Sequence, residues 1–260
     1  MPRNDWFPEN VDPAAYDPVR AARGDKPNLP TRFYTRAEAG EGEAGFHLLL
    51  DGRPARTPAR KPLALRVRAA ADLLAAEWAA QAEVIDPAAM PLTRIVNAAL
   101  DHVAERLDEV RADAAKYAGS DLLFYRAEEP QRLVARQQEL WDPVLAWAAE
   151  RYGARFMLSA GINYVEQPAR SLQAVRAAID AIADPAALAA LHVMTTLTGS
   201  VLLALAVAER RLTPQEAFAL AELDADTQRE IWGADAEADA ARARREREML
   251  AAAALYLALA

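Results

Sequence analysis

The stretch VNAALDHVAERLDEVRADAAKY, residues 96–117, carries the clearest structural signal in the sequence. Its apolar side chains recur at alternating intervals of four and three residues: Val96, Leu100, Val103, Leu107, Val110, Ala114 and Tyr117. These intervals place the side chains along one side of an α-helix, so the stretch predicts an amphipathic helix packed against a core.

The same helical period extends over most of the chain beyond residue 68. One helical face carries Leu74, Trp78, Gln81 and Ile85. Further helices are expected over residues 130–151, 170–183, 186–210, 214–222 and 235–259. Asp142-Pro143 has the pattern of a helix cap followed by proline at the first helical position. Residues 130–151 could therefore form two shorter helices instead of one. A strand is expected in ARFMLSAG, residues 154–161.

Upstream of residue 68 the period changes and predicts a small antiparallel sheet. The β-like runs are TRFYTR (31–36), FHLLL (46–50), PART (54–57) and LALR (63–66). Turn-rich stretches separate them, including AGEGEAG (39–45) and Asp51-Gly52, which suits a two-residue hairpin turn that needs positive φ. Residues 1–30 contain six prolines, which disfavour helix and sheet hydrogen bonds and predict an extended arm.

Together these patterns predict an α+β fold in three parts. A Pro-rich arm (1–30) is followed by a small antiparallel β-rich α/β domain (31–90) and a larger all-helical domain (91–260).

Composition excludes several classes of function. The 260-residue chain carries a formal net charge of -8, which argues against a general nucleic-acid binder because such proteins need a basic surface. It contains no cysteine, which excludes disulfides, thiolate zinc sites, iron–sulfur clusters and cysteine nucleophiles. The N-terminal residues lack an apolar secretion signal and include acids that a transit peptide avoids, so we expect a cytoplasmic protein.

Residues 185–208 contain no Asp, Glu, Lys or Arg and are long enough to span a bilayer. Polar residues such as His192, Thr195 and Ser200 interrupt the run, and lipid would leave them unsatisfied. We therefore expect a buried central helix, with TLTGS (196–200) as the place for a break, and no stable membrane insertion.

No motif of a familiar catalytic or metal site stands out. The three histidines, His47, His102 and His192, have no histidine or cysteine partner at metal-ligand spacing. The sequence contains no G-x-x-x-x-G-K-[ST] loop, no strand-linked G-x-G-x-x-G and no G-x-S-x-G motif. We expect no metal, no cofactor and no enzymatic activity. The alternative is an enzyme whose acid–base carboxylates meet only in the folded chain.

The stretch WGADAEADAARARRERE, residues 232–248, combines an aromatic residue with dense charge. Asp235 is placed to cap a helix whose first turns hold Glu237 and Asp239. The arginines that follow stand at helical spacing from glutamates: Arg242 with Glu246 and Arg244 with Glu248. Capping explains the acids but not Trp232, and a rigid aromatic beside charges is common at recognition surfaces.

A second charged segment, residues 51–68, carries six basic residues against one acid: Arg53, Arg56, Arg60, Lys61, Arg66 and Arg68 against Asp51. Charged side chains commonly guard the edge of a sheet, so a solvated strand edge explains them. A positive face for an acidic partner is the functional alternative.

Several stretches resemble one protein family, in order along residues 31–260. IWGADAEADAARARRERE (231–248) resembles the C-terminal signature of the assembly chaperones for the alpha subunit of F-type ATP synthase. RFYTRAEAGEGEAGFHLLLDGRPARTP (32–58) resembles their N-terminal hairpin signature. Three stretches resemble successive core segments: AAEWAAQAEVIDPAAMPLTRIVNAALD, YAGSDLLFYRAEEPQRLVARQQELWDPVLAW and LTGSVLLALAV.

The resemblance implies a small N-terminal α/β domain joined to a larger helical one, and a binding activity instead of a reaction. Members of the family hold the unassembled alpha subunit by the surface that would meet the beta subunit, and release it when the catalytic head assembles. We therefore expect a monomeric chaperone with alpha as its client and beta as the competitor for release. Family members act in the bacterial cytoplasm or in the mitochondrial matrix.

The resemblance also points to site residues. Glu237 is the acid expected to matter most for the client, with Trp232, Asp235 and Asp239 beside it. Ala234 departs from the family pattern, which often has an acid there, so we assign no role to that position. Further candidates for partner binding match the hairpin and core motifs: Arg53, Arg56, Arg94, Asp121 and Arg126. Capping and hydrogen bonds between domains explain these equally well.

Overall fold

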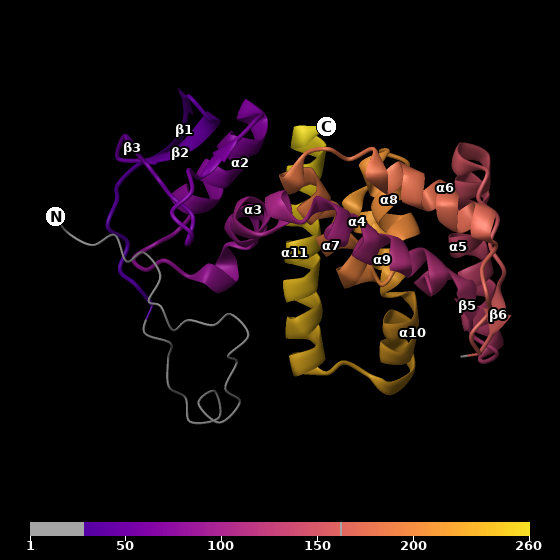
Figure 1. Ribbon diagram of the computed structural model, residues 1–260. Coiled ribbons are helices and arrows are strands. Elements are labelled where there is room, and N and C mark those ends of the chain that lie inside the picture. The colour runs from indigo at the N-terminus through magenta and orange to yellow at the C-terminus, as the bar shows by residue number, and fades with distance from the viewer. Residues whose placement is uncertain (1–28, 162) are drawn as a thin grey trace.

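The computed structural model describes residues 29–161 and 163–260, and Figure 1 shows the chain passing from a small sheet with one helix into a larger group of helices. The fold is therefore α+β with a larger helical part, as the change of period near residue 68 predicts. The expected Pro-rich arm lies outside the described residues except for Leu29 and Pro30. The domain boundary at residue 90 stays a prediction.

The small sheet contains four strands: β1 (Ala37–Gly42), β2 (Gly45–Leu50), β3 (Arg53–Pro54) and β4 (Ala64–Leu65). β2 is the central strand and pairs antiparallel with each of the other three. Asp51 and Gly52 connect β2 to β3 with φ angles of 47° and 77°, so the predicted hairpin turn with positive φ is confirmed.

The first strand lies where the sequence predicts a turn. β1 occupies much of the AGEGEAG stretch (39–45), whereas in TRFYTR the one β-bridge joins Thr31 to Val84. Glycine suits this strand because a Cβ atom on Gly40 would lie 2.3 Å from Leu49 Cδ1 on β2. Of the two aromatic residues of TRFYTR, which suggested a strand, Tyr34 is buried in the core and Phe33 is 47% exposed.

Helix α2 (Arg68–Ala79) packs against β1 and β2 and turns its buried side chains toward them. Near its end, the carboxylate of Glu77 accepts hydrogen bonds from the N–H groups of Leu92 (2.8 Å) and Thr93 (2.7 Å). These two residues begin helix α3 (Pro91–Asp101). Burial raises the pKa of Glu77 above its usual range. One carboxyl group thus joins the helix on the sheet to the first helix of the larger part.

The apolar stripe of residues 96–117 is not one continuous helix. Four elements share it: α3, the 3-10 turn η2 (Val103–Glu105), α4 (Leu107–Lys116) and the 3-10 turn η3 (Tyr117–Gly119), which begins at Tyr117. Asp101 at the end of α3 is buried, and it accepts hydrogen bonds from the Thr57 hydroxyl (2.6 Å) and the Ala59 N–H (3.1 Å). This contact fixes the end of α3, and the chain leaves helical geometry at His102. All seven side chains still pack in or against the core, so the inward face is confirmed and the single helix is wrong.

The remaining helices form the larger part of the molecule: α5 (Gln131–Tyr152), α6 (Ala169–Asp180), α7 (Pro185–Thr198), α8 (Val201–Ala208), α9 (Pro214–Ala221), α10 (Leu223–Trp232) and α11 (Ala236–Leu259). Further 3-10 turns are η1 (Pro87–Ala89) and η4 (Leu122–Phe124). α7 contacts α3, α4, α8 and α11 and so lies at the centre. The strand expected in residues 154–161 is found in part: only Ser159–Ala160 form it, as β6, which pairs in parallel with β5 (Tyr125–Arg126).

Two features of this part go beyond the sequence-based expectations. α5 is a single helix through Pro143, which lies on its exposed side, where water most easily replaces a lost backbone hydrogen bond. The sequence does not predict α10, because only two of its side chains, Leu223 and Thr227, are buried and they give no visible apolar period.

The uncharged run of residues 185–208 is buried and broken near its middle, as expected. Gly199 ends α7 with a left-handed φ of 66°, and the Ser200 hydroxyl caps α8 by accepting a hydrogen bond from the Leu203 N–H at 3.0 Å. In the described part of the chain, no helix is both long and apolar enough to cross a bilayer.

Candidate protein-binding site

Helices α10 and α11 form an antiparallel hairpin at the lower end of the helical part in Figure 1, and residues 233–235 connect them. Three ion pairs join the two sides of the hairpin: Glu222–Arg245, Asp226–Arg242 (3.0 Å) and Arg229–Asp239 (2.9 Å). Three of the nine charged residues in 232–248, Asp239, Arg242 and Arg245, therefore fasten one side of the hairpin to the other. We call residues 231–237, at the closed end of the hairpin, the tip.

The ion pairs predicted along α11 are found in part. Arg242 contacts Glu246 at 3.5 Å, in addition to its closer partner on α10. Glu248 pairs with Arg94 of α3 at 3.1 Å, and Arg244 is not its partner. The predicted Arg244–Glu248 pair is therefore wrong, because α3 brings its own arginine to that side of α11. The same contact places Arg94 between two helices and away from the tip.

The tip exposes two large apolar side chains. Trp232 is 82% exposed and Ile231 is 51% exposed. The indole N–H of Trp232 donates to Gln228 Oε1 at 2.9 Å, which orients the ring while most of its surface stays in water. Gly233 follows with a φ of 97° and a ψ of 174°, a backbone geometry that is open essentially to glycine alone. Exposed tryptophan contributes little to folding, and it is the side chain that most often anchors protein interfaces.

Two of the three acids at and beside the tip have partners within the protein, and the third, Glu237, does not pair with any described residue. Asp235 caps α11, as predicted, by accepting a hydrogen bond from the Ala238 N–H at 2.8 Å. Asp239 is held by Arg229. Glu237 is exposed and forms no ion pair with any residue that the structure describes. Its carboxylate is therefore accessible to a basic group on a partner.

The candidates on the small sheet lie in another part of the molecule. Arg53 is in β3 and Arg56 follows it, and both are exposed. Arg56 donates a hydrogen bond to the Arg60 carbonyl at 2.9 Å. Three other basic residues of segment 51–68 are in ion pairs: Lys61–Glu105, Arg66–Asp184 and Arg68–Asp72. The positive face considered as the alternative is thus partly neutralised, which favours the interpretation as a solvated sheet edge.

Asp121 is fully buried and holds the break between α7 and α8. Its Oδ1 accepts a hydrogen bond from the Leu123 N–H and its Oδ2 from the Leu202 N–H, both at 3.1 Å. The Ser200 hydroxyl bonds to the same carboxyl group. Burial raises the pKa of Asp121 to about 6. These contacts give Asp121 a structural role within the fold. A direct contact between Asp121 and a partner stays a prediction, and the burial of the side chain does not favour it.

Arg126 joins β5 to α5. Its guanidinium group donates to the carbonyls of Leu123 and Gln137, both at 3.0 Å, and to Asp142 at 2.8 Å. It also lies over the ring of Trp141, 5.2 Å from the centroid. Three of its five N–H donors are satisfied inside the molecule, and its role in partner binding likewise stays a prediction.

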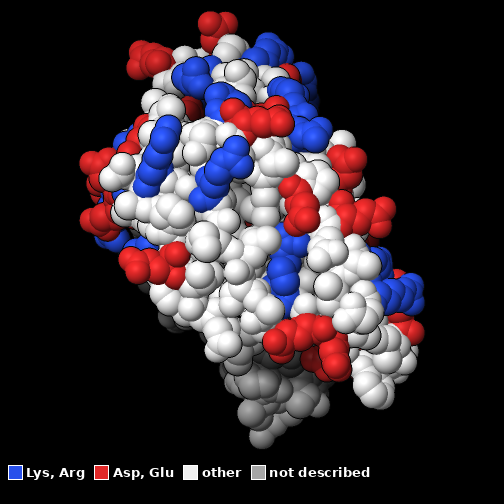
Figure 2. Space-filling model, turned by 90° about the vertical axis from the view of Figure 1, so that its right-hand side faces the viewer, with Lys and Arg blue, Asp and Glu red and all other residues white. Residues whose placement is uncertain are grey.

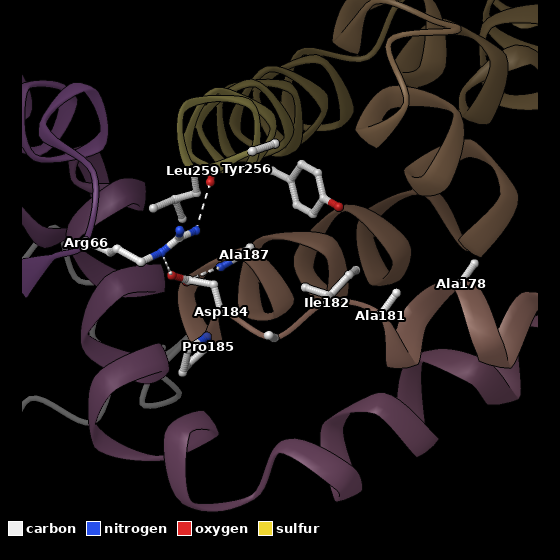
Figure 3. Close-up of a pocket in the computed structure, with 11 residues that line it drawn as sticks. Arg66, Ala178, Ala181, Ile182, Asp184, Pro185, Ala187, Tyr256 and Leu259 are labelled. Carbon is white, nitrogen blue, oxygen red and sulfur yellow. Dashed lines mark hydrogen bonds and ion pairs between the residues drawn. The ribbon is translucent and has the colours of Figure 1, made fainter.

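A cavity of about 700 Å³ between α6, α7 and the end of α11 offers a test of the enzyme alternative (Figure 3). Five of its eleven lining residues are alanine, and its one acid, Asp184, pairs with Arg66 at 3.1 Å and caps α7. Arg66 also donates to the Leu259 carbonyl at 3.1 Å. An acid–base pair of carboxylates is not part of this lining. Among the described residues, no group of three His, Asp or Glu could hold a metal ion.

Sequence reasoning did not find the exposed apolar residues that follow α5: Met157, Leu158 and Tyr164. Met157 and Leu158 belong to ARFMLSAG, whose pattern predicts a strand. Such a pattern does not say whether the apolar side chains of a strand meet a core or a partner, so the sequence contains no signal for this exposure.

Comparison with known proteins identifies the family to which this chain is similar. The family model described as ATP12 chaperone protein matches residues 31–149. The crystal structure of Atu1473, a candidate chaperone from Agrobacterium tumefaciens, is 46% identical, with a TM-score of 0.86 over 98% of this chain and 92% of that chain. The crystal structure of Atp12 from Paracoccus denitrificans is 41% identical, with a TM-score of 0.82 over 89% of this chain and 99% of that chain.

An aspartate-to-lysine variant of the same Paracoccus protein also matches, with 41% identity and a TM-score of 0.81 over 89% of this chain and 98% of that chain. Identity at this level over nearly the whole length of the relatives means that the family is shared as well as the fold. The chain therefore belongs to the ATP12 chaperone family, whose members are chaperones of ATP synthase assembly.

Proposed function

We propose that this protein binds the unassembled alpha subunit of the ATP synthase catalytic head, covers its beta-facing surface and releases it during assembly. Membership of the ATP12 family supports a chaperone role in ATP synthase assembly. The observation that supports the tip as the contact is Trp232, a large aromatic side chain that stays 82% exposed on a hairpin fastened by ion pairs.

The physical need for such a chaperone follows from the nature of the client. A subunit of an obligate complex has a large apolar interface, and before assembly this surface is exposed and prone to aggregate. The chain contains no phosphate-binding loop motif that would suggest nucleotide-driven release. We therefore infer release by competition, in which beta binds the same surface of alpha more tightly than the chaperone does. We expect the chaperone to act as a monomer.

Light scattering of the client tests this function. The isolated alpha subunit is diluted from denaturant with and without an equimolar amount of this protein, and beta is added afterwards. We expect less scattering with the protein present, a mixed complex on size-exclusion chromatography, and loss of that complex when beta is added. Unchanged scattering and no mixed complex would contradict the proposal.

Reversing the charge of Glu237 is expected to weaken binding of alpha by about 10-fold at low salt, because the tip then repels a basic group that it attracted. The effect should shrink as salt is raised, since exposed charges are screened. Glu109→Lys is the matched control, because Glu109 is also an exposed acid in the first turn of a helix, α4. Titration at two salt concentrations measures both variants. A folded Glu237→Lys protein that protects alpha like the wild type would remove Glu237 from the contact.

A further inference from the structure

A second apolar surface lies in the chain that follows α5. Met157 is 52% exposed, Leu158 46% and Tyr164 71%. Three of the eight large hydrophobic side chains that the described chain exposes thus lie close together in the sequence, and we call these three residues, Met157, Leu158 and Tyr164, the 157–164 segment. Single exposed apolar side chains are normal on soluble proteins, but a cluster of them marks a contact surface.

The backbone that leads into this segment is held by buried polar side chains. The Gln167 side chain accepts a hydrogen bond from the Met157 N–H (2.9 Å) and donates one to the Met157 carbonyl (3.0 Å). The Ser171 hydroxyl binds the N–H and the carbonyl of Arg155 in the same way, at 2.9 and 2.6 Å. Both Gln167 and Ser171 are buried. The backbone around Met157 is therefore fixed from inside, while the side chains of Met157 and Leu158 stay outside.

This arrangement does little for the stability of the fold. Apolar side chains stabilise a protein when they are removed from water, and those of the 157–164 segment are about half exposed or more. A partner that covers them gains that burial. The contact with Met157 also costs little conformational entropy, because the backbone that presents this side chain is already fixed.

Hydrogen bonds connect this segment with the tip through α5. Gln137 of α5 is buried; it accepts a hydrogen bond from the Ala127 N–H, directly after β5, and donates one to Asp224 of α10, both at 2.8 Å. Arg136 of α5 pairs with Glu230, the residue before the tip, at 3.2 Å. β6 pairs with β5, so the β5–β6 pair, α5 and α10 form one connected block. This block exposes apolar side chains at two places.

Figure 2 shows the side of the molecule on which α5, α6 and the β5–β6 pair lie. Uncharged side chains, apolar and polar together, occupy a broad area of this side, and acidic and basic side chains lie within it and around it. A surface that mixes uncharged side chains with charges of both signs is compatible with a protein interface, whose rim is polar. Neither sign of charge dominates the border, so the surface fits a protein partner better than a nucleic acid or an anionic membrane.

We propose that the 157–164 segment is a second anchor for the client alpha subunit, an inference that rests on the function proposed above. A stable protein interface covers about 800 Å² on each partner, roughly 20–30 residues. Trp232 and Ile231 supply only a small part of that area, and the same connected block supplies more without rearrangement. The surface bound there is the apolar face that alpha exposes before it meets beta.

Hydroxyl-radical footprinting of the wild-type protein, free and bound to alpha, tests the second anchor without any substitution. Methionine, tyrosine and tryptophan side chains are readily oxidised, and Met157, Tyr164 and Trp232 are exposed in the free protein. We expect oxidation of all three to fall several-fold in the complex. Protection of Trp232 with unchanged oxidation of Met157 and Tyr164 would confine the contact to the tip and overturn the inference.

A triple variant, Met157→Ser with Leu158→Ser and Tyr164→Ser, gives the energetic test. We expect it to bind alpha about 10-fold more weakly than the wild type, with a wild-type circular dichroism spectrum, because the replaced side chains lie outside the core. Val84→Ser, which changes an exposed apolar residue beside the small sheet, should bind like the wild type. Wild-type affinity in the triple variant would overturn the second anchor.

The controls separate this inference from the function on which it rests. If the wild-type protein itself fails to bind alpha, the proposed function is wrong. If the wild type binds alpha and the triple variant binds equally well, only the second anchor is wrong. Sedimentation of the protein alone tests whether a second copy of this chain covers the 157–164 segment instead. If the wild type forms a dimer that the triple variant does not form, and both bind alpha with the same affinity, the segment serves self-association and the inference is wrong.

Discussion

Replacement of Trp232 by alanine is expected to weaken binding of the alpha subunit by about 30-fold or more, since truncation of an anchor residue costs at least about 2 kcal/mol. Trp232 is 82% exposed at the end of α10, so a partner can cover its indole ring without unfolding any element. The same exposure implies a change in unfolding temperature of no more than about 2 °C. Titration of labelled alpha measures the first effect and differential scanning calorimetry the second.

Trp232→Phe is the matched control for this change. Phenylalanine keeps a six-membered aromatic ring at the tip and loses the five-membered ring of the indole, with the N–H that donates to Gln228. It should therefore retain most of the affinity. If Trp232→Ala bound alpha as tightly as the wild type, the tip would not be the contact, and the client surface would have to lie elsewhere on the molecule.

Replacement of Asp121 by alanine is expected to lower the free energy of unfolding by about 3 kcal/mol, or roughly 6–12 °C in unfolding temperature for a chain of this length. The N–H groups of Leu123 and Leu202 would lose their acceptor inside the core, and so would the Ser200 hydroxyl. Urea denaturation followed by circular dichroism measures the change. A loss below about 1 kcal/mol would mean that water or a shifted backbone satisfies these donors.

Asp121→Asn separates the charge of this group from its shape. Burial raises the pKa of Asp121 in the folded protein to about 6, from a usual value of 3.8. Between these values the unfolded chain releases the proton while the folded protein keeps it, so the stability that the group contributes falls as pH rises from about 4 to 6. The stability of the wild type relative to Asp121→Asn should therefore fall over that range and level off above it. Urea denaturation of both proteins at several pH values tests this, and a difference that does not change with pH would contradict it.

Elements with local signals could be predicted from the sequence. The turn at Asp51-Gly52 requires only two adjacent residues that accept positive φ. The Asp235 cap requires only the first turn of the helix that follows it in the sequence. The end of α3 is different, because Asp101 finds its partner Thr57 44 residues away along the chain. The apolar period of residues 96–117 could therefore show which side faces the core but not where the helix stops.

The candidate site shows the same division. Trp232 stands out in the sequence because no capping role explains an aromatic residue there. The partners of the charges on α11 could not be identified, because spacing along one helix says nothing of α10, which brings Asp226 to Arg242, or of α3, which brings Arg94. The exposure of Met157 depends on a hydrogen bond to a side chain ten residues later in the sequence.

α11 begins at the tip and ends beside the small sheet, where the Leu259 carbonyl accepts a hydrogen bond of 3.1 Å from Arg66. It is one uninterrupted helix of 24 residues and is therefore a rod about 36 Å long. If a helix of this length tilts by about 5° about one of its ends, its other end moves by about 3 Å. A client that tilted α11 by that angle would separate the Leu259 carbonyl from Arg66. Binding at the tip would then change a contact at the opposite end of α11.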